Sequence, residues 1–365
     1  MIKEGKFGVH EAICLVTISI SNKLFSTTPG YLTRTVGNTG WYMTLISCVS
    51  ALVFFTFIYL LLKRFSGKNI VEIYDAALGR VIGFIFSFAL MVSFLGSSGI
   101  YTREFTDVMK VYVYPITPPG FLTGALLIVV AISAFLGLET IARVAKLAAY
   151  FALFAFLLLL ILSSEYFRFA HIFPILGYGL GKTITSGILR SSAYSEVVVL
   201  AVFAGSLQGT GHIKKAGYIS LFLSGFILSI ILLCYTMVFE YTSTEEITAP
   251  IYVIARLIKF GAFFQRMDPL FLFLWIFTTI IYISIMFYSA VSIYCKIFRL
   301  QDTRPLIIPM AVLAFTAAIF PEDFPSVITE YVQGLRTYGN ITFFILPFIA
   351  LIVAVLRKKK GEKLN

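Results

Sequence analysis

The stretch TISISNKLFSTTPG, residues 17–30, decides the fold. It lies in a long apolar run near the start of the chain, and Pro29 stands one turn beyond a group of polar side chains: Ser19, Ser21, Asn22, Lys23 and Ser26. A charged residue at the centre of a membrane-spanning helix costs on the order of 3 kcal/mol. Interrupted backbone survives at that depth only where it faces protein or a watery cavity. We therefore expect a helix that is broken in the middle of the membrane.

A second stretch of the same kind is ILRSSAYSEVVVL, residues 188–200. It also gathers polar side chains inside an apolar run: Arg190, Ser191, Ser192, Ser195 and Glu196. The same physical argument predicts a second interrupted helix here.

The composition of the whole chain is that of an integral membrane protein. Hydrophobic residues make up 59% of the 365 residues, charged residues 13%, and the mean hydropathy is +0.92, whereas a soluble domain carries roughly 25% charge. The solvent for most of this chain is therefore expected to be membrane lipid. No polar segment carries a basic stripe with interleaved aromatics, so the net charge of +11 does not indicate a nucleic-acid partner.

About ten apolar stretches are long enough to cross a hydrocarbon core, which takes about 20 residues. They are residues 8–37, 40–63, 81–111, 120–137, 143–163, 187–207, 214–240, 268–298, 304–320 and 340–357. We expect one all-α integral membrane bundle over residues 1–365, ending in a basic tail at 358–365. The interrupted stretches are the first and sixth of ten, which is the spacing of two inverted five-helix repeats, at about 8–163 and about 187–357.

The distribution of lysine and arginine predicts the orientation, because cytoplasmic loops are enriched in them. With the N-terminus inside, cytoplasmic segments hold 18 of the 29 cationic residues and external segments hold 10, while Lys23 lies within a span. Both termini are therefore expected in the cytoplasm. Two connections, 69–80 and 247–266, mix apolar and charged positions at helical spacing, which predicts interfacial helices. The second is expected to lie over the bundle surface, with a lid over an external cavity as the alternative.

Two polar interruptions at matching places in the two halves indicate a binding site at the membrane midplane. The N-terminus of a half-helix offers free N–H groups to an anion, and the C-terminus of another offers carbonyl oxygens to a cation. A zwitterionic α-amino acid carries both charges and suits a cavity between them. The expected ligand-binding residues at the two breaks are Ser19, Ser21, Asn22, Lys23, Ser192, Tyr194, Ser195 and Glu196.

Two hypotheses concern the charged members, Lys23 and Glu196: both face an internal cavity, or they also pair directly and a ligand competes for one partner. Weaker candidates come from the third and eighth spans, namely Ser98, Tyr101, Tyr282 and Ser284. Tyrosine and serine in membrane helices usually make interhelical contacts, so that alternative stays open. The charged group Arg103, Glu104 and Asp107 favours an internal salt bridge over a ligand site.

Catalysis and metal binding have no support in the sequence. No metalloprotease, nucleophile-elbow or phosphate-loop motif is present, and the four cysteines form no paired motif. We expect neither an enzyme nor a cofactor or metal.

The chain resembles the B subunit of the Ger-type nutrient germinant receptors of spore-forming bacteria, within the amino acid–polyamine–organocation transporter superfamily. The resemblance is carried, in order, by Pro29 and by the stretches YTREFTDVMKVY (101–112), FPILGYGLGK (173–182), SEVVVL (195–200), HIKKAGY (212–218) and RMDPLFLFLWI (266–276). Together they run along nearly the whole chain.

The resemblance implies a LeuT-like fold in which helices one and six are discontinuous. It implies a membrane subunit that senses amino acids or similar nutrients at the spore inner membrane and works with A-type and C-type subunits to trigger germination. Glu196 matches a glutamate usual in the sixth helix of that family. The alternative function is an ordinary proton- or cation-coupled amino acid transporter with the same fold.

One departure from the family pattern lies in the first helix. Members typically carry a Gly-x-Gly turn there, whereas this chain has Asn22-Lys23-Leu24. The lysine ammonium would then replace free N–H groups as the partner of an anion, or stand where a transported cation would sit.

Overall fold

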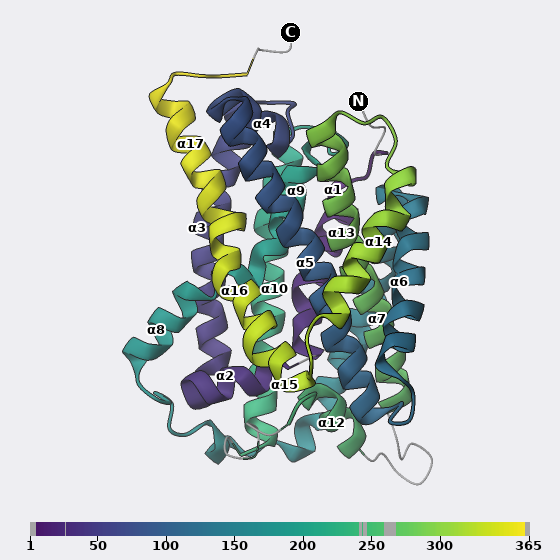
Figure 1. Ribbon diagram of the computed structural model, residues 1–365. Coiled ribbons are helices and arrows are strands. Elements are labelled where there is room, and N and C mark those ends of the chain that lie inside the picture. The colour runs from purple at the N-terminus through teal and green to yellow at the C-terminus, as the bar shows by residue number, and fades with distance from the viewer. Residues whose placement is uncertain (1–4, 26, 241–242, 244–246, 259–267, 362–365) are drawn as a thin grey trace.

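The computed structural model describes residues 5–25, 27–240, 243, 247–258 and 268–361, without the side chains of Leu24 and Phe25. Ser26 and the last part of the predicted interfacial helix, residues 259–266, lie outside this set. The part of the chain that is described contains helices and no strand. The long helices stand side by side in one bundle, and the two ends of the chain lie at the same end of it (Figure 1).

The first half of the chain supplies the helices up to residue 163. They are α1 (Val9–Ser21), η1 (Asn22–Phe25), α2 (Thr28–Val36), η2 (Gly37–Thr39), α3 (Gly40–Arg64), α4 (Ile70–Leu78), α5 (Arg80–Tyr112), α6 (Pro119–Leu136) and α7 (Leu138–Ser163). The connection to the second half holds η3 (Ser164–Tyr166) and η4 (Phe169–Ile172).

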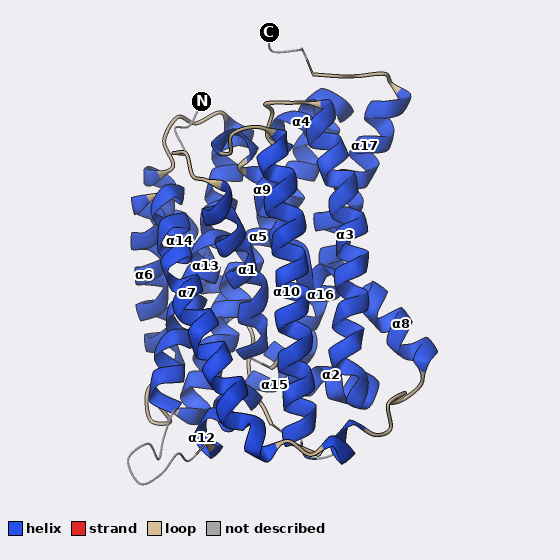
Figure 2. Ribbon diagram, turned by 180° about the vertical axis from the view of Figure 1, so that it is seen from behind, coloured by secondary structure: helices blue, strands red, loops and turns tan. Residues whose placement is uncertain are grey.

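The second half contains more short elements than the first. Its helices are α8 (Leu180–Leu189), η5 (Ser191–Val198), α9 (Val199–Val202), η6 (Ala204–Ser206), α10 (Thr210–Val238), α12 (Pro250–Leu257), α13 (Asp268–Phe298), α14 (Arg304–Ile319), α15 (Phe324–Ser326), η7 (Val327–Val332), α16 (Gln333–Asn340), η8 (Ile341–Ile345) and α17 (Leu346–Leu356). Figure 2 shows the same bundle from behind, with α10 and α7 on the near side.

Seven helical stretches among the described residues are long and apolar enough to cross a membrane, and α1 and α14 are shorter apolar helices. Together with the interrupted stretch from α8 to α9, they make the ten crossings that the hydropathy of the chain predicts. Large apolar side chains such as Val81, Phe121, Phe154 and Ile308 are exposed on the outside of the bundle. An outer surface of this kind is stable in hydrocarbon and not in water.

The prediction for the tenth crossing, residues 340–357, is too short. The helical stretch begins at Phe324 and runs through η7, α16 and η8 to Leu356. The polar stretch 333–340 lowers the local hydropathy, yet its largest polar residue, Arg336, is only 4% exposed. Hydropathy assigns this stretch to an external loop because it counts a polar residue in the same way whether or not it is buried, and here Gln333 and Arg336 are buried in the protein. Smaller shifts occur at the fifth and sixth crossings, which begin at Leu138 and Leu180.

The predicted interfacial helices are present where they are described. The helix α4 lies at the end of the bundle near the two chain termini (Figure 1). The other, α12, lies near the opposite end, where it buries Ile251, Tyr252 and Ile254 and leaves Arg256 more exposed. It therefore packs on the bundle by one face, as a helix lying over the surface does, and the lid remains a prediction.

A capping box starts α4. The side chain of Asn69 accepts hydrogen bonds from the N–H groups of Val71 and Glu72, and the Glu72 carboxylate accepts one from the Asn69 N–H at 3.1 Å. Replacing Asn69 by alanine leaves these N–H groups without their acceptor, so we expect Asn69→Ala to lower the free energy of unfolding by about 1 kcal/mol. Unfolding of the purified protein in mixed micelles measures the loss. Asn69→Asp keeps an acceptor and is the control; equal losses in the two variants would contradict the capping argument.

The tail after α17 folds back onto α3. Arg64 donates from Nε to the Lys359 carbonyl at 2.6 Å and from Nη2 to the Ala354 carbonyl at 3.1 Å, and the Gly361 N–H donates to the Arg64 carbonyl. The described part of the basic tail is therefore anchored to the bundle.

Candidate functional site

The first crossing is interrupted where the sequence predicts. The α-helix α1 ends at Ser21, the chain continues as a 3₁₀ turn from Asn22, and a new helix begins at Thr28. Pro29 occupies the first turn of α2, a position where its missing N–H costs no hydrogen bond and its fixed φ suits a helix start. The polar residues before it therefore lie between two half-helices.

The sixth crossing is interrupted in a different way. Helix α8 ends at Leu189, and an eight-residue 3₁₀ segment, η5, carries the chain to the short helix α9. Runs of 3₁₀ helix longer than three or four residues are uncommon, and such a stretch within a helix often marks a functional hinge. Most of η5 is buried, including Glu196.

An ion pair joins the two breaks. The Lys23 ammonium lies 2.7 Å from each carboxylate oxygen of Glu196 and also donates to the Ala193 carbonyl. The two side chains are 4% and 3% exposed. Lys23 and Glu196 therefore pair directly, as one of the two hypotheses for these residues states. Burial without a partner would be costly for either charge, so each neutralises the other at the level of the breaks.

Asn22, next to Lys23, fixes the first break to α13. Its Oδ1 accepts hydrogen bonds from the hydroxyls of Thr278 at 3.0 Å and Thr279 at 3.1 Å. Both threonines are buried. The end of α1 is therefore held against the eighth crossing by a polar contact.

A carboxylate from the third crossing occupies the start of α2. Glu104 Oε1 accepts hydrogen bonds from the N–H of Thr27, at 3.2 Å, and from the Thr27 hydroxyl. The N-terminus of a helix attracts negative charge through its free N–H groups and its dipole. In this structure the protein itself supplies that anion, and Glu104 is 1% exposed.

Arg336 of α16 connects the breaks to the tenth crossing. Its Nη2 donates to the Thr28 hydroxyl at 2.7 Å, and its carbonyl accepts a hydrogen bond from the Ser192 hydroxyl. Its Nε is buried with no partner among the described residues. One residue therefore contacts α2 and η5 at the same time, which couples their positions.

The cavity beside the ion pair, which we call the central cavity, is very small. Its volume is about 10 Å³, and it is lined by Asn22, Lys23, Tyr101, Glu104, Phe105, Trp275, Thr279 and Tyr282. That is about the space of one water molecule, so an amino acid needs the surrounding elements to move apart. The Tyr282 hydroxyl is buried there with no partner among the described residues, and its ring meets Tyr101 edge to face at 5.2 Å.

The structure brings some of the expected site residues together and separates others. Asn22, Lys23, Tyr101 and Tyr282 line the central cavity, and Glu196 binds Lys23. Ser19 and Ser98 donate instead to carbonyls of their own helices, Leu15 and Leu95. Ser192 donates to Arg336, Ser195 is buried in η5, and the hydroxyls of Ser21 and Ser284 are buried without a partner among the described residues.

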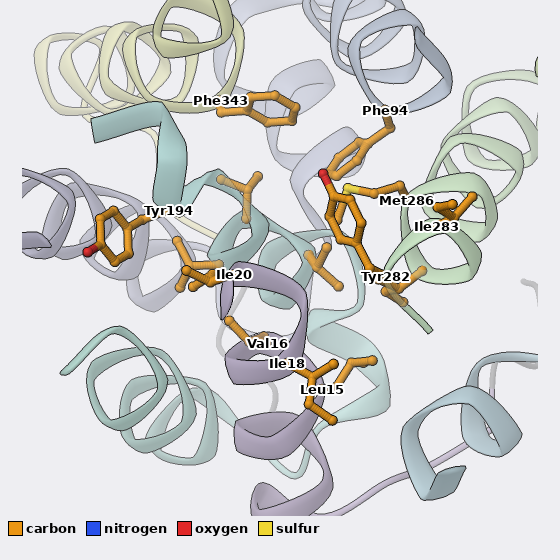
Figure 3. Packing of buried hydrophobic residues seen from close by; sticks show 14 of the residues in the cluster. Leu15, Val16, Ile18, Ile20, Phe94, Tyr194, Tyr282, Ile283, Met286 and Phe343 are labelled. Atoms are coloured by element: carbon orange, nitrogen blue, oxygen red, sulfur yellow. The ribbon is translucent and has the colours of Figure 1, made fainter. Parts of the chain in front are cut away.

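Tyr194 lies on the other side of its segment from the central cavity. Its hydroxyl donates to the Thr44 carbonyl of α3 at 2.9 Å. Figure 3 shows Tyr194 and Tyr282 on opposite sides of the labelled α1 residues, with Tyr282 near Phe94 and Met286. Tyr194 therefore anchors the sixth break to α3.

Glu104 and Arg336 are the charged residues near the site that the sequence argument missed. Glu104 was grouped with Arg103 and Asp107; that salt bridge is confirmed between Arg103 and Asp107 at 2.7 Å, but Glu104 points elsewhere. The spacing of Tyr101 and Glu104 could have indicated that Glu104 faces the site, because residues three apart share a helix face. Arg336 is spaced three residues from Gln333 and four from Asn340, which predicts that the three lie on one polar face of a helix and not in a loop.

A larger hollow opens at the end of the bundle that carries the chain termini. It has a volume of about 730 Å³, and its charged and polar lining includes Lys6, Asn69, Glu72, Asp75, Lys296 and Arg299. Lys296 donates to the Val202 carbonyl after the sixth break at 2.7 Å. Within the described ranges, no group of three or more His, Cys, Asp or Glu side chains could hold a metal ion.

Comparison with solved structures shows the class of fold. The structure matches a Na⁺-coupled sialic acid symporter with a TM-score of 0.66 at 13% identity, covering 94% of this chain and 79% of that one. It matches the nucleobase-cation-symport-1 transporter Mhp1 with a TM-score of 0.63 at 11% identity, covering 98% and 92%. It matches MhsT, solved in complex with L-phenylalanine, with a TM-score of 0.57 at 13% identity, covering 98% of this chain and 91% of that one. The predicted LeuT-like fold, with helices one and six discontinuous, is confirmed.

Sequence comparison shows the family. The profile described as "Spore germination protein" matches residues 9–325. Spore germination protein KB of Bacillus subtilis (strain 168) is 25% identical over 99% of this chain and 98% of its own length, and spore germination protein A2 of the same organism is 24% identical over 98% of each. This chain belongs to the spore germination protein family, as the sequence resemblance predicts. The family and the apolar helices show an integral membrane protein.

Proposed function

We propose that this chain is the membrane subunit of a nutrient germinant receptor and that it binds a small amino acid-like nutrient between the first and sixth crossings. The observation that carries the proposal is the buried pair Lys23–Glu196, which joins the two breaks. A zwitterion presents the same two charges as this pair. Its carboxylate can take the place of Glu196 beside Lys23, and its ammonium the place of Lys23 beside Glu196.

Binding of this kind is an exchange of partners and so leaves no charge uncompensated. The Tyr282 hydroxyl and the Arg336 Nε, buried without partners among the described residues, are further groups that a polar ligand would satisfy. Because the cavity of about 10 Å³ is too small for an amino acid, the nutrient is expected to select an arrangement in which the breaks lie farther apart. Partner subunits would read that shift in population.

The remaining features of the proposal rest on the family resemblance and on the charge distribution of the chain. The A-type and C-type receptor subunits are the proposed partners, and the spore inner membrane is the proposed location. We place both termini in the cytoplasm, on the lysine and arginine distribution. That count included Arg103 and Arg336 as external, and both are buried in the bundle; their removal from the external set increases the asymmetry.

A second candidate function is secondary transport of amino acids. Two of the structural neighbours are a symporter and a transporter, and the same fold would serve both candidate functions. Uptake of labelled amino acids into proteoliposomes that contain only this chain separates the two. Sustained gradient-driven uptake would favour transport, and saturable binding without uptake would favour sensing.

The direct test of the proposal is a screen of the purified chain against the common amino acids by thermal unfolding. A ligand at 100 times its dissociation constant stabilises the folded state by about 2.7 kcal/mol, so a true ligand raises the unfolding temperature in a saturable way. Glu196→Gln and Lys23→Met should abolish this shift.

Glu139→Gln is the matched control, since it removes one partner of the exposed pair Arg143–Glu139 and should leave the shift intact. No shift with any amino acid, or an equal shift in all three variants, would contradict binding at the pair.

A further inference from the structure

A second cavity lies beside the first break and shares the lining residue Asn22 with the central cavity. It has a volume of about 200 Å³ and is lined by residues of α1, α7, α10, α12 and α13. On α1 the lining runs from Ile13 to Asn22, a rise of about 14 Å along the helix axis. We call this cavity the lateral crevice.

The lateral crevice opens toward the membrane. Figure 2 shows α1 between α7 and α10. Leu153 of α7 is 47% exposed and Leu223 of α10 is 39% exposed, and both line the cavity. At this level of the bundle the surrounding solvent is hydrocarbon, so a molecule dissolved in the bilayer can enter without crossing water.

The end of the lateral crevice toward the chain termini is bounded by an ion pair. Lys146 of α7 and Glu11 of α1 are 2.7 Å apart, and each precedes the first lining residue of its helix, Ala149 and Ile13. A charged ligand from that side would have to pass this pair. Between α7 and α10 the lining side chains are apolar apart from the hydroxyl of Tyr150.

The lateral crevice is lined by two hydroxyls that have no hydrogen-bond partner in the described part of the chain. Thr17 Oγ1 and Ser21 Oγ, one turn apart on α1, are buried and make no hydrogen bond with the described residues. Apart from Cys14, Asn22, Thr278 and the hydroxyl of Tyr150, the rest of the wall is aliphatic or aromatic, as with Ile227 and Phe271. An occupant that fits both surfaces has an apolar body and one neutral hydrogen-bonding group, since an ionised group would be costly in this surrounding.

We propose that the lateral crevice binds a neutral amphiphile drawn from the bilayer, of the class of medium-chain alcohols. Its size agrees, because an apolar cavity of about 150 Å³ holds a benzene molecule and this cavity is larger. The alcohol hydroxyl bonds to Thr17 or Ser21, and the chain lies between α7 and α10. Asn22 and Thr278 line the same cavity and are hydrogen-bonded to each other at 3.0 Å, so an occupant contacts the residue next to Lys23 and can bias the first break.

The test uses an octanol that carries a photoactivatable diazirine on its chain, added to the purified full-length protein in detergent. After irradiation and digestion, mass spectrometry locates the adducts. We expect them on α1, α7 and α10 residues of the lateral crevice, with labelling that saturates and is lost when plain 1-octanol is added in excess. Adducts spread over the outer surface of the bundle, without competition, would overturn the proposal.

Two filling variants and one control sharpen the result. Ile227→Trp and Ala152→Trp place a large ring in the cavity and should lose the competed labelling. Phe222→Trp lies on α10 as well, but Phe222 is 68% exposed and outside the cavity, so labelling of the crevice should persist. If a folded Ile227→Trp protein is still labelled at the wild-type level, and that labelling is lost on adding 1-octanol, the proposal is wrong. If both filling variants fail to fold, the competition by 1-octanol on the unmodified chain still tests whether the lateral crevice binds the alcohol.

Discussion

Glu196→Gln should lower the free energy of unfolding by about 3–5 kcal/mol, because it leaves the Lys23 ammonium buried without its counter-charge. The pair is 4% and 3% exposed, and both carboxylate oxygens lie 2.7 Å from the lysine nitrogen. The Ala193 carbonyl would remain as an acceptor for Lys23, but a neutral dipole does not replace a full charge. Lys23→Met should cost a similar amount, since it leaves the Glu196 carboxylate unpaired.

The double variant distinguishes an ion pair from two independent residues. With both charges removed, neither is left uncompensated, so Lys23→Met/Glu196→Gln should be more stable than either single variant. Unfolding of purified proteins in mixed micelles measures all three. Glu139→Gln breaks an exposed pair with side chains 72% and 39% accessible and should cost no more than about 1 kcal/mol. Strictly additive losses in the cycle would show that Lys23 and Glu196 do not act as a pair.

The sequence predicts the breaks because their causes are local. A lysine and several serines inside an apolar run conflict with burial in lipid, and Pro29 suits the start of a new helix. These signals need no knowledge of neighbouring helices. They therefore predict both interrupted crossings and the residues that meet there, Lys23 and Glu196, without any tertiary information.

The remaining contacts at the site depend on the tertiary structure. Nothing local to Glu104 indicates that its carboxylate meets Thr27, which is 77 positions away in the chain. Arg336 lies in a polar stretch that hydropathy assigns to a loop, although the side chain is buried against α2. Tyr194 was expected at the site from its place in the break, but the irregular 3₁₀ backbone of η5 turns its hydroxyl toward α3. Helical periodicity cannot give side-chain directions in such a segment.

The seam between α3 and α10 matters to the site because Tyr194 binds Thr44 on α3. This seam is built on a close approach at Gly217 of α10. A Cβ atom added there would lie 1.9 Å from Cζ of Phe55, a ring that is 0% exposed. Small residues at such positions let membrane helices pack closely. A second glycine of α10, Gly225, faces Cys48 of α3 in the same way, with 2.6 Å to its sulfur.

Gly217→Ala should therefore destabilise the protein by about 1–3 kcal/mol, the usual cost of inserting a methyl group into a packed core. Gly211→Ala is the control on the same helix, because no atom lies within 4 Å of its added Cβ; there the better helix propensity of alanine should add up to about 1 kcal/mol. Unfolding in mixed micelles measures both. In a Phe55→Leu background the cost of Gly217→Ala should shrink, since the clashing ring is gone. An unchanged cost would mean that the close approach at Gly217 does not limit the packing of α3 on α10.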